Sequence, residues 1–101
     1  MAFGVKRAEL EAWKEQVRRG EVAFITHFWL HPRCPDITTV TKAGCADLAA
    51  LLAWGEKYGL GSQHLHHREE FPHFDLIGDK QKEVLVGEAL WDQIKRFRIK
   101  I

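Results

Sequence analysis

The sequence has few of the features that mark secreted or membrane proteins. It contains only two cysteines, Cys34 and Cys45, too few for a disulfide framework, which indicates a reducing, cytoplasmic environment. No apolar run approaches the roughly 18 residues that a membrane-spanning helix needs. The first residues become charged at Lys6 and lack the apolar stretch of a signal peptide, so neither secretion nor membrane insertion is expected.

An excess of charge of one sign is also missing. Fifteen Lys and Arg residues against fourteen Asp and Glu residues give a net charge of +1. No overall field therefore directs this protein to nucleic acid or to an anionic membrane. The basic segments at residues 6–19 and 95–100 are balanced by nearby acidic residues and match no RNA-binding signature, so a nucleic-acid partner is not expected.

Internal repeats, low-complexity tracts and linkers rich in Pro, Gly and Ser are absent as well. With 101 residues, 46% of them apolar and 29% charged, the chain is expected to form one globular domain over residues 1–101. What it has in abundance is tryptophan, four residues, and histidine, six residues, of which four lie between positions 64 and 73. The large aromatic side chains predict a small core built around rings.

Hydrophobic periodicity predicts three helices and three strands. The helices are expected over residues 6–19, over residues 46–58 and from an N-cap at Asp79 onward. The strands are expected over residues 22–29, 63–68 and 71–77. Residues 37–42 favour β-structure but are few, and the alternating tail at residues 96–101 is either an edge strand or a frayed end.

The alternation of helices and strands favours an α/β fold, with a short, mostly parallel sheet and three flanking helices. The strand from Val22, the helix from Ala46 and the strand from Gln63 would form a right-handed crossover unit. In such a sheet, ligands bind beyond the carboxyl ends of the parallel strands, beside the helix N-termini. Polar residues from several segments would then gather at one edge.

Three runs of this sequence carry a resemblance to a known family. They are AFITHFW at residues 23–29, TVTKAGCADLAALLAWGEKYGL at 39–60 and HLHHREEFPHFDL at 64–76. Together they resemble the small bacterial YneQ-like proteins over residues 4–100. More loosely, over residues 22–90, they resemble a family known only as a domain of unknown function. The resemblance implies no activity and supplies no catalytic residue.

The segment HFDL is the first candidate for chemistry. In a strand, side chains alternate between faces, so His73 and Asp75 share one face and Phe74 and Leu76 the other. A histidine and a carboxylate so placed can share a metal ion, or can act as an acid/base pair in which the carboxylate sets the imidazole tautomer. The alternative is structural, with Asp75 hydrogen-bonded to a loop and His73 half-exposed.

The segment HLHHR is the second candidate. If it is extended, His64, His66 and Arg68 lie on one face. Zinc and manganese sites use the spacing His-x-His on a strand, because both imidazoles then project to the same side. The same spacing also arises by chance in a chain rich in histidine, and that reading stays open.

The third candidate is an anion site at the start of the helix from Ala46. Unpaired amide groups at a helix N-terminus attract phosphate or carboxylate, and Gly44 and Cys45 lie beside it, with Arg33 and Lys42 as cations. Cys45 there is either a reactive thiol of lowered pKa or a buried apolar residue. Asp47 in the first turn is the alternative to a ligand, because it offsets the helix dipole by itself.

Taken together, these candidates predict a histidine-rich polar pocket for an anionic small molecule, phosphorylated or carboxylated, with hydrolysis as one form of its function. A divalent metal ion, zinc or manganese, is its candidate cofactor. The residues expected to contribute are His73 and Asp75 as catalytic residues, His27, His66, His73 and Asp75 as metal ligands, and Arg33, Lys42, Gly44, Cys45 and Arg68 as anion-binding residues.

A second class of function remains open. The protein can be a non-enzymatic interaction module in which the histidines are structural. Because a domain of this length gains from burying more apolar surface, a homodimer is its expected form. Trp91, Phe97 and Ile99 are the residues expected at the dimer interface.

Overall fold

The sheet is antiparallel throughout. In the computed structural model, which describes residues 3–66 and 71–101, the strand order is β1-β2-β4-β3, and each neighbouring pair runs antiparallel. The strands are β1 (Ala23–Phe28), β2 (Thr39–Gly44), β3 (Leu65–His66) and β4 (His73–Leu76). The helices are α1 (Arg7–Arg18), α2 (Leu48–Glu56), α3 (Gly78–Gly87) and α4 (Trp91–Arg96), with a short 3-10 turn, η1 (Ser62–His64).

The prediction of an α/β fold is therefore confirmed, but the mostly parallel sheet with three helices is wrong. The error lies in residues 37–42, which contribute to β2, a central strand paired on both sides. Because β2 follows β1 through a loop, the two strands form an antiparallel pair. The helical connection through α2 joins β2 to β3, which run in the same direction, but β4 lies between them. The expected crossover from the strand at Val22 is thus absent.

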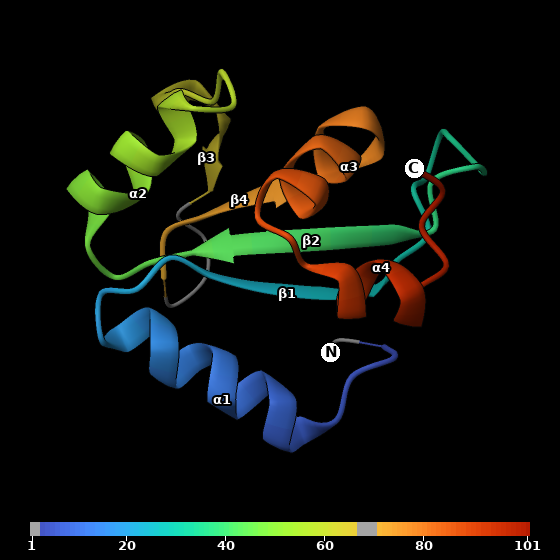
Figure 1. Ribbon diagram of the computed structural model, residues 1–101, viewed down its shortest axis with the longest axis horizontal. Coiled ribbons are helices and arrows are strands. Elements are labelled where there is room, and N and C mark those ends of the chain that lie inside the picture. The colour runs from blue at the N-terminus through green and yellow to red at the C-terminus, as the bar shows by residue number, and fades with distance from the viewer. Residues whose placement is uncertain (1–2, 67–70) are drawn as a thin grey trace.

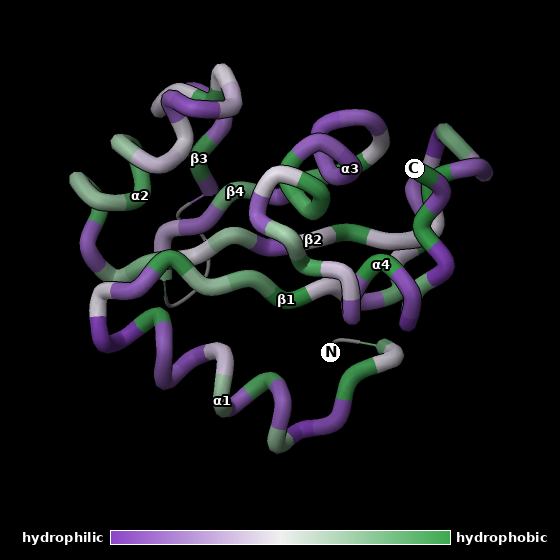
Figure 2. Tube along the Cα trace, in the orientation of Figure 1, coloured by the Kyte–Doolittle hydropathy of each residue, from purple (hydrophilic) through white to green (hydrophobic). Residues whose placement is uncertain are grey.

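The helices lie on both faces of the sheet (Figure 1). α1 packs on one face, where Trp13 and Val17 contact Ala23 and Ile25 of β1. α2 and α3 cover the other face, over a larger core that includes Leu51, Trp54, Phe74, Leu76 and Val84. Figure 2 shows mainly hydrophobic residues along β1, a mixture of hydrophobic and hydrophilic residues along β2 and β4, and hydrophilic residues over much of α1 and α3. Among the described residues, no helix is both long and apolar enough to cross a membrane.

The segment from Asp79 onward, predicted as one helix, forms two helices, α3 and α4. α3 ends at Gly87, and the chain then adopts a positive φ of 56° at Ala89 before α4 begins. A second positive φ, 54° at Arg98, follows the end of α4. The expected N-cap, Asp79, lies inside the first turn of α3, and Ile77 precedes the helix. The segment 97–101 forms no strand, and Phe97 is buried.

A chain of buried polar side chains crosses the core between the sheet and the last two helices. The Gln81 amide donates to the Thr41 hydroxyl at 3.0 Å, Thr41 and Thr26 lie 2.6 Å apart, and Thr26 donates to Gln93 at 2.6 Å. Gln93 in turn donates to the Phe24 carbonyl of β1, at 3.3 Å. Thr26 donates its one hydroxyl proton to Gln93, so its oxygen accepts the proton of Thr41. Each residue of the chain therefore donates to the next, from Gln81 to the Phe24 carbonyl.

Candidate functional site

Four polar side chains lie on the sheet face that α1 covers only in part. Lys42 of β2 is paired with Asp75 of β4, and His66 of β3 is paired with His73 of β4. Because side chains alternate along each strand, all four project to the same face. The structure therefore brings together His66, His73, Asp75 and Lys42, which the sequence had assigned to metal, catalytic or anion-binding roles.

Asp75 is placed between the two imidazoles. Its Oδ1 lies 3.5 Å from His73 Nε2, and its Oδ2 lies 3.6 Å from His66 Nε2. The two imidazole rings stack, with centroids 5.6 Å apart. The side chain of His73 is 3% exposed, whereas that of Asp75 is 34% and that of His66 is 50% exposed. A ligand can thus reach His66 and Asp75, whereas the His73 ring is buried and contacts the Asp75 carboxylate.

The neighbours of the buried histidine raise its pKa. Burial by itself lowers the pKa of His73, but Asp75 and the Phe71 carbonyl, 3.0 Å from Nδ1, favour the imidazolium, and the net effect raises the pKa. For Asp75, burial raises the pKa, and the opposing influence of His73, His66 and Lys42 lowers it overall. The two groups therefore form a partly buried ion pair.

This pair predicts pH-dependent stability. A raised pKa means that protonated His73 stabilises the fold fully below its ordinary pKa of 6.5, and that this stabilisation is lost as the pH rises through the folded-state value. Asp75, with a lowered pKa, is ionised in the folded and unfolded states above its ordinary value of 3.8 and adds no change above pH 6. We expect His73→Gln to cost more unfolding free energy at pH 6 than at pH 8.

Urea unfolding of the wild type and of His73→Gln at the two pH values measures this effect. Asp75→Asn, which removes the partner carboxylate, is the matched variant, and it should show the same pH dependence without adding to the first substitution. Equal losses at pH 6 and pH 8 would mean that His73 stabilises the fold through packing alone.

β4 has a free edge beyond these residues. β3 pairs only with Phe74 and His73, because the chain before it forms the turn η1 rather than an extended strand. The edge of β4 from Asp75 onward opens into a cavity of about 440 Å³. We call this the β4-edge cavity; it is lined by Leu60, Gln63, His64, His66, Phe74, Asp75, Leu76, Ile77 and Lys80.

The lining of the β4-edge cavity includes two histidines, one lysine and one carboxylate. His64 Nδ1 accepts a hydrogen bond from the Gly61 amide at 3.1 Å, which leaves its Nε2 as a donor. Lys80 contributes an ammonium group that also donates to the Tyr58 carbonyl at 2.5 Å and to Glu83 at 2.8 Å. The one carboxylate in the lining, Asp75, is already compensated by His73. The turn thus brings His64 and His66 to one cavity, although His64 is not in an extended segment.

Two of the predicted residues lie elsewhere. Arg33 is exposed in the loop between β1 and β2, at the opposite end of β2 from His66. His27 lies on β1, which β2 separates from β4. Its Nδ1 is 3.0 Å from the Phe28 carbonyl. The expectation that all candidates meet at one edge depended on parallel strands, and it is wrong because the sheet is antiparallel.

Gly44 and Cys45 are both buried. Gly44 lies under the Trp13 ring, and Cys45 is 0% exposed. Burial raises the pKa of the Cys45 thiol, more than the backbone hydrogen bond at Asp47 lowers it, so the thiol is not activated. Asp47 caps α2 by accepting from the Ala50 amide at 3.1 Å, which is the alternative to a ligand. Arg68 lies outside the described residues.

A metal centre is not formed by the part of the chain that the structure describes. Within residues 3–66 and 71–101, no group of three or more His, Cys, Asp or Glu side chains is arranged to hold a metal ion. His27 is removed from the other three expected ligands by its position on β1. The zinc or manganese prediction therefore has no support from these residues.

The residues expected at a dimer interface are only partly accessible. Phe97 is 6% exposed and packs edge-on against Phe28, whereas Trp91 is 47% exposed. Other exposed apolar side chains lie near the end of β1, at Phe3, Trp29 and Leu30. A homodimer stays a prediction, but Phe97 is not free to contribute to it.

Three polar residues carried no functional signal in the sequence: Lys80, which lines the β4-edge cavity, and Gln81 and Lys100, which line a second cavity. Lys80 and Gln81 belong to a helix whose polar positions resemble any solvated face, although Gln81 is 4% exposed. Lys100 lies in the basic tail, which the charge balance had marked as ordinary surface. Their positions beside a cavity depend on how α3 and the C-terminal segment pack against the sheet, which the sequence pattern does not show.

The fold and the site define a small α/β protein with an antiparallel four-stranded sheet and a histidine-lined cavity at the free edge of β4. One relative is a Bacillus subtilis (strain 168) protein named uncharacterized protein YneQ, which is 56% identical over 99 residues, 98% of this chain and 100% of the relative. The chain belongs to the YneQ family, as its sequence motifs predicted. No protein-family model matches, so the looser resemblance gains no support, and no solved structure matches.

Proposed function

We propose that this protein binds a small anionic molecule, phosphorylated or carboxylated, in the β4-edge cavity. The observation that carries the proposal is the position of Asp75 between a buried and an exposed imidazole at the wall of the cavity. Because His73 compensates the carboxylate, the exposed donors of His66 and His64 remain available to an anion, and Lys80, which also donates to Tyr58 and Glu83, adds positive charge.

The assigned roles follow from exposure and contact. His66 donates to the anion and is oriented by Asp75. His73 is a positioning residue, since its buried ring contacts the carboxylate and not the cavity. His64, through its Nε2, is the second donor.

A titration with inorganic phosphate tests the proposal. In amide-resolved NMR spectra, we expect shifts at Gln63, His64 and His66, and we expect His66→Gln to weaken binding about fivefold to tenfold, the loss of one charge-assisted hydrogen bond at a partly exposed site. His31→Gln is the matched control, because His31 Nδ1 also accepts backbone amide protons, from Arg33 and Cys34, but outside the cavity. Equal affinities in both variants, or no shifts at these amides, would refute the proposal.

The catalytic form of the proposal needs a separate measurement. Turnover of p-nitrophenyl phosphate that requires added Zn²⁺ or Mn²⁺ and is lost in Asp75→Asn would extend binding to metal-assisted hydrolysis. Binding of phosphate without turnover would confine the function to recognition.

A further inference from the structure

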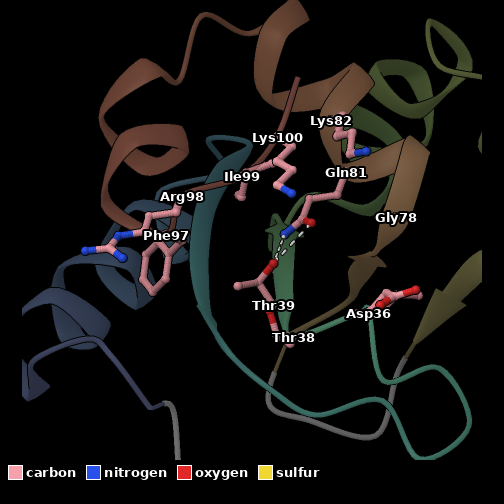
Figure 3. Close-up of a pocket in the computed structure, with 11 residues that line it drawn as sticks. Asp36, Thr38, Thr39, Gly78, Gln81, Lys82, Phe97, Arg98, Ile99 and Lys100 are labelled. Atoms are coloured by element: carbon pink, nitrogen blue, oxygen red, sulfur yellow. Dashed lines mark hydrogen bonds between the residues drawn. The ribbon is translucent and has the colours of Figure 1, made fainter.

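A second cavity lies beside the start of β2 and the first turns of α3, next to the β4-edge cavity, with which it shares no residue. It has a volume of about 460 Å³ and is bounded by the start of β2, the first turns of α3 and the C-terminal segment (Figure 3). We call it the tail cavity. Its lining consists of Asp36, Ile37, Thr38, Thr39, Gly78, Gln81, Lys82, Phe97, Arg98, Ile99 and Lys100.

The tail cavity is predominantly cationic. Lys82, Arg98 and Lys100 contribute three positive charges, and Asp36 contributes the one negative charge of the lining. Lys82 lies 3.9 Å from the carboxylate of Asp79, at the limit of an ion pair. Within the described residues, no acidic side chain forms an ion pair with Lys100 or Arg98. This local excess contrasts with the net charge of +1 for the whole chain.

The floor of the tail cavity is rigid and polar. Gln81 and Thr39 are 4% and 6% exposed and are joined by hydrogen bonds of 3.2 and 3.3 Å. Figure 3 shows the ammonium group of Lys100 directed toward these two side chains, whereas the guanidinium of Arg98 extends past Phe97, away from the cavity. Lys100 is therefore the cation directed at the cavity floor, Lys82 contributes a second ammonium group at the cavity wall, and Arg98 adds only to the surrounding positive potential.

The backbone at the end of α4 holds Lys100 in this position. Arg98 adopts a positive φ of 54°, and the Ile99 amide donates to the Ile94 carbonyl at 3.0 Å. This is the usual hydrogen bond of a left-handed helix cap, which turns the chain back on itself. Phe97 is buried and anchors the turn against Phe28, so the segment crosses the cavity instead of leaving the surface.

We propose that the tail cavity binds a small molecule carrying a phosphate monoester, with the phosphate between Lys82 and Lys100 and the organic part against Phe97, Ile99 and Ile37. Two ammonium groups match the double negative charge of a phosphate monoester better than the single charge of a carboxylate. The first residue of α3, Gly78, lines the same cavity, but Asp79 in the first turn offsets the partial positive charge of that helix end, so the positive potential comes from the lysines. The proposal does not rest on the function assigned to the β4-edge cavity.

Phenyl phosphate is a suitable probe, because it combines a dianion with an apolar ring. In an NMR titration we expect shifts at Thr38, Thr39, Lys82 and Lys100, and none at His64 or His66. Lys82→Gln and Lys100→Gln should each weaken binding about tenfold, since each removes a charge-assisted hydrogen bond. Lys95→Gln is the matched control, because Lys95 is an exposed lysine of α4 that lines neither cavity.

Two analogues of phenyl phosphate separate the contribution of the phosphate to binding from that of the aromatic ring. Phenol, which lacks the phosphate, should not bind, and benzoate, which carries one negative charge, should bind less tightly than phenyl phosphate. The affinity for phenyl phosphate should fall as salt is added. Equal binding to Lys100→Gln and Lys95→Gln, tighter binding of benzoate, or shifts confined to the β4-edge cavity would each overturn the proposal.

Discussion

Replacing Gly44 by alanine is expected to lower the free energy of unfolding by about 3 kcal/mol, the upper end of the range for overpacking a core. A Cβ at this position would lie 2.8 Å from Cζ2 of Trp13 and 3.3 Å from Cγ2 of Val17. Neither the strand nor the ring can move easily. Gly44 is paired on both sides, and Trp13 donates a buried hydrogen bond to the Ala23 carbonyl at 3.0 Å.

Gly61→Ala is the control for this substitution. A Cβ at Gly61 would also meet an atom at short distance, Oε1 of Gln63 at 2.5 Å, but that atom is the end of a flexible, exposed side chain. We therefore expect a loss below about 1 kcal/mol. Chemical denaturation of both variants decides the matter. Similar losses would contradict the packing role of Gly44.

Replacing Gln81 by leucine is expected to cost about 2 kcal/mol of unfolding free energy, because the fold keeps its shape but loses the first donor of the buried polar chain. Thr39 and Thr41 are 6% and 0% exposed, and both hydroxyls hydrogen-bond to Gln81. At present no buried side-chain nitrogen or oxygen of the described residues lacks a partner. The leucine variant would leave the Thr39 hydroxyl without one.

The control here is Gln16→Leu, which makes the same chemical change at an exposed position of α1. Its effect on stability should remain within about 0.5 kcal/mol. Adding Thr39→Val to Gln81→Leu should recover part of the loss, since removing both partners of a buried hydrogen bond costs less than removing one. If the double variant were no more stable than the single one, the loss would come from packing and not from an unsatisfied hydroxyl.

The sequence predicted local structure well where the signal is local. The apolar stripe of residues 6–19 became α1, the β-branched and aromatic run at 22–29 became β1, and the alternation in HFDL became β4. The same-face rule for a strand also placed His73 beside Asp75 before any tertiary structure was considered. These predictions depend on periods of 3.6 and 2 residues, which are properties of the chain itself.

The sequence alone thus determined most of the elements, the resemblance to the YneQ family and the His73–Asp75 pair. Only the tertiary structure decided the strand order, and with it which residues meet. A central β2 made the sheet antiparallel, separated His27 and Arg33 from His66, and buried Gly44 and Cys45. It also brought Gln81 and Lys100, 19 positions apart, to one cavity. The physical reason is that periodicity fixes the face of a residue within its own strand or helix, whereas pairing between strands depends on packing across the whole core.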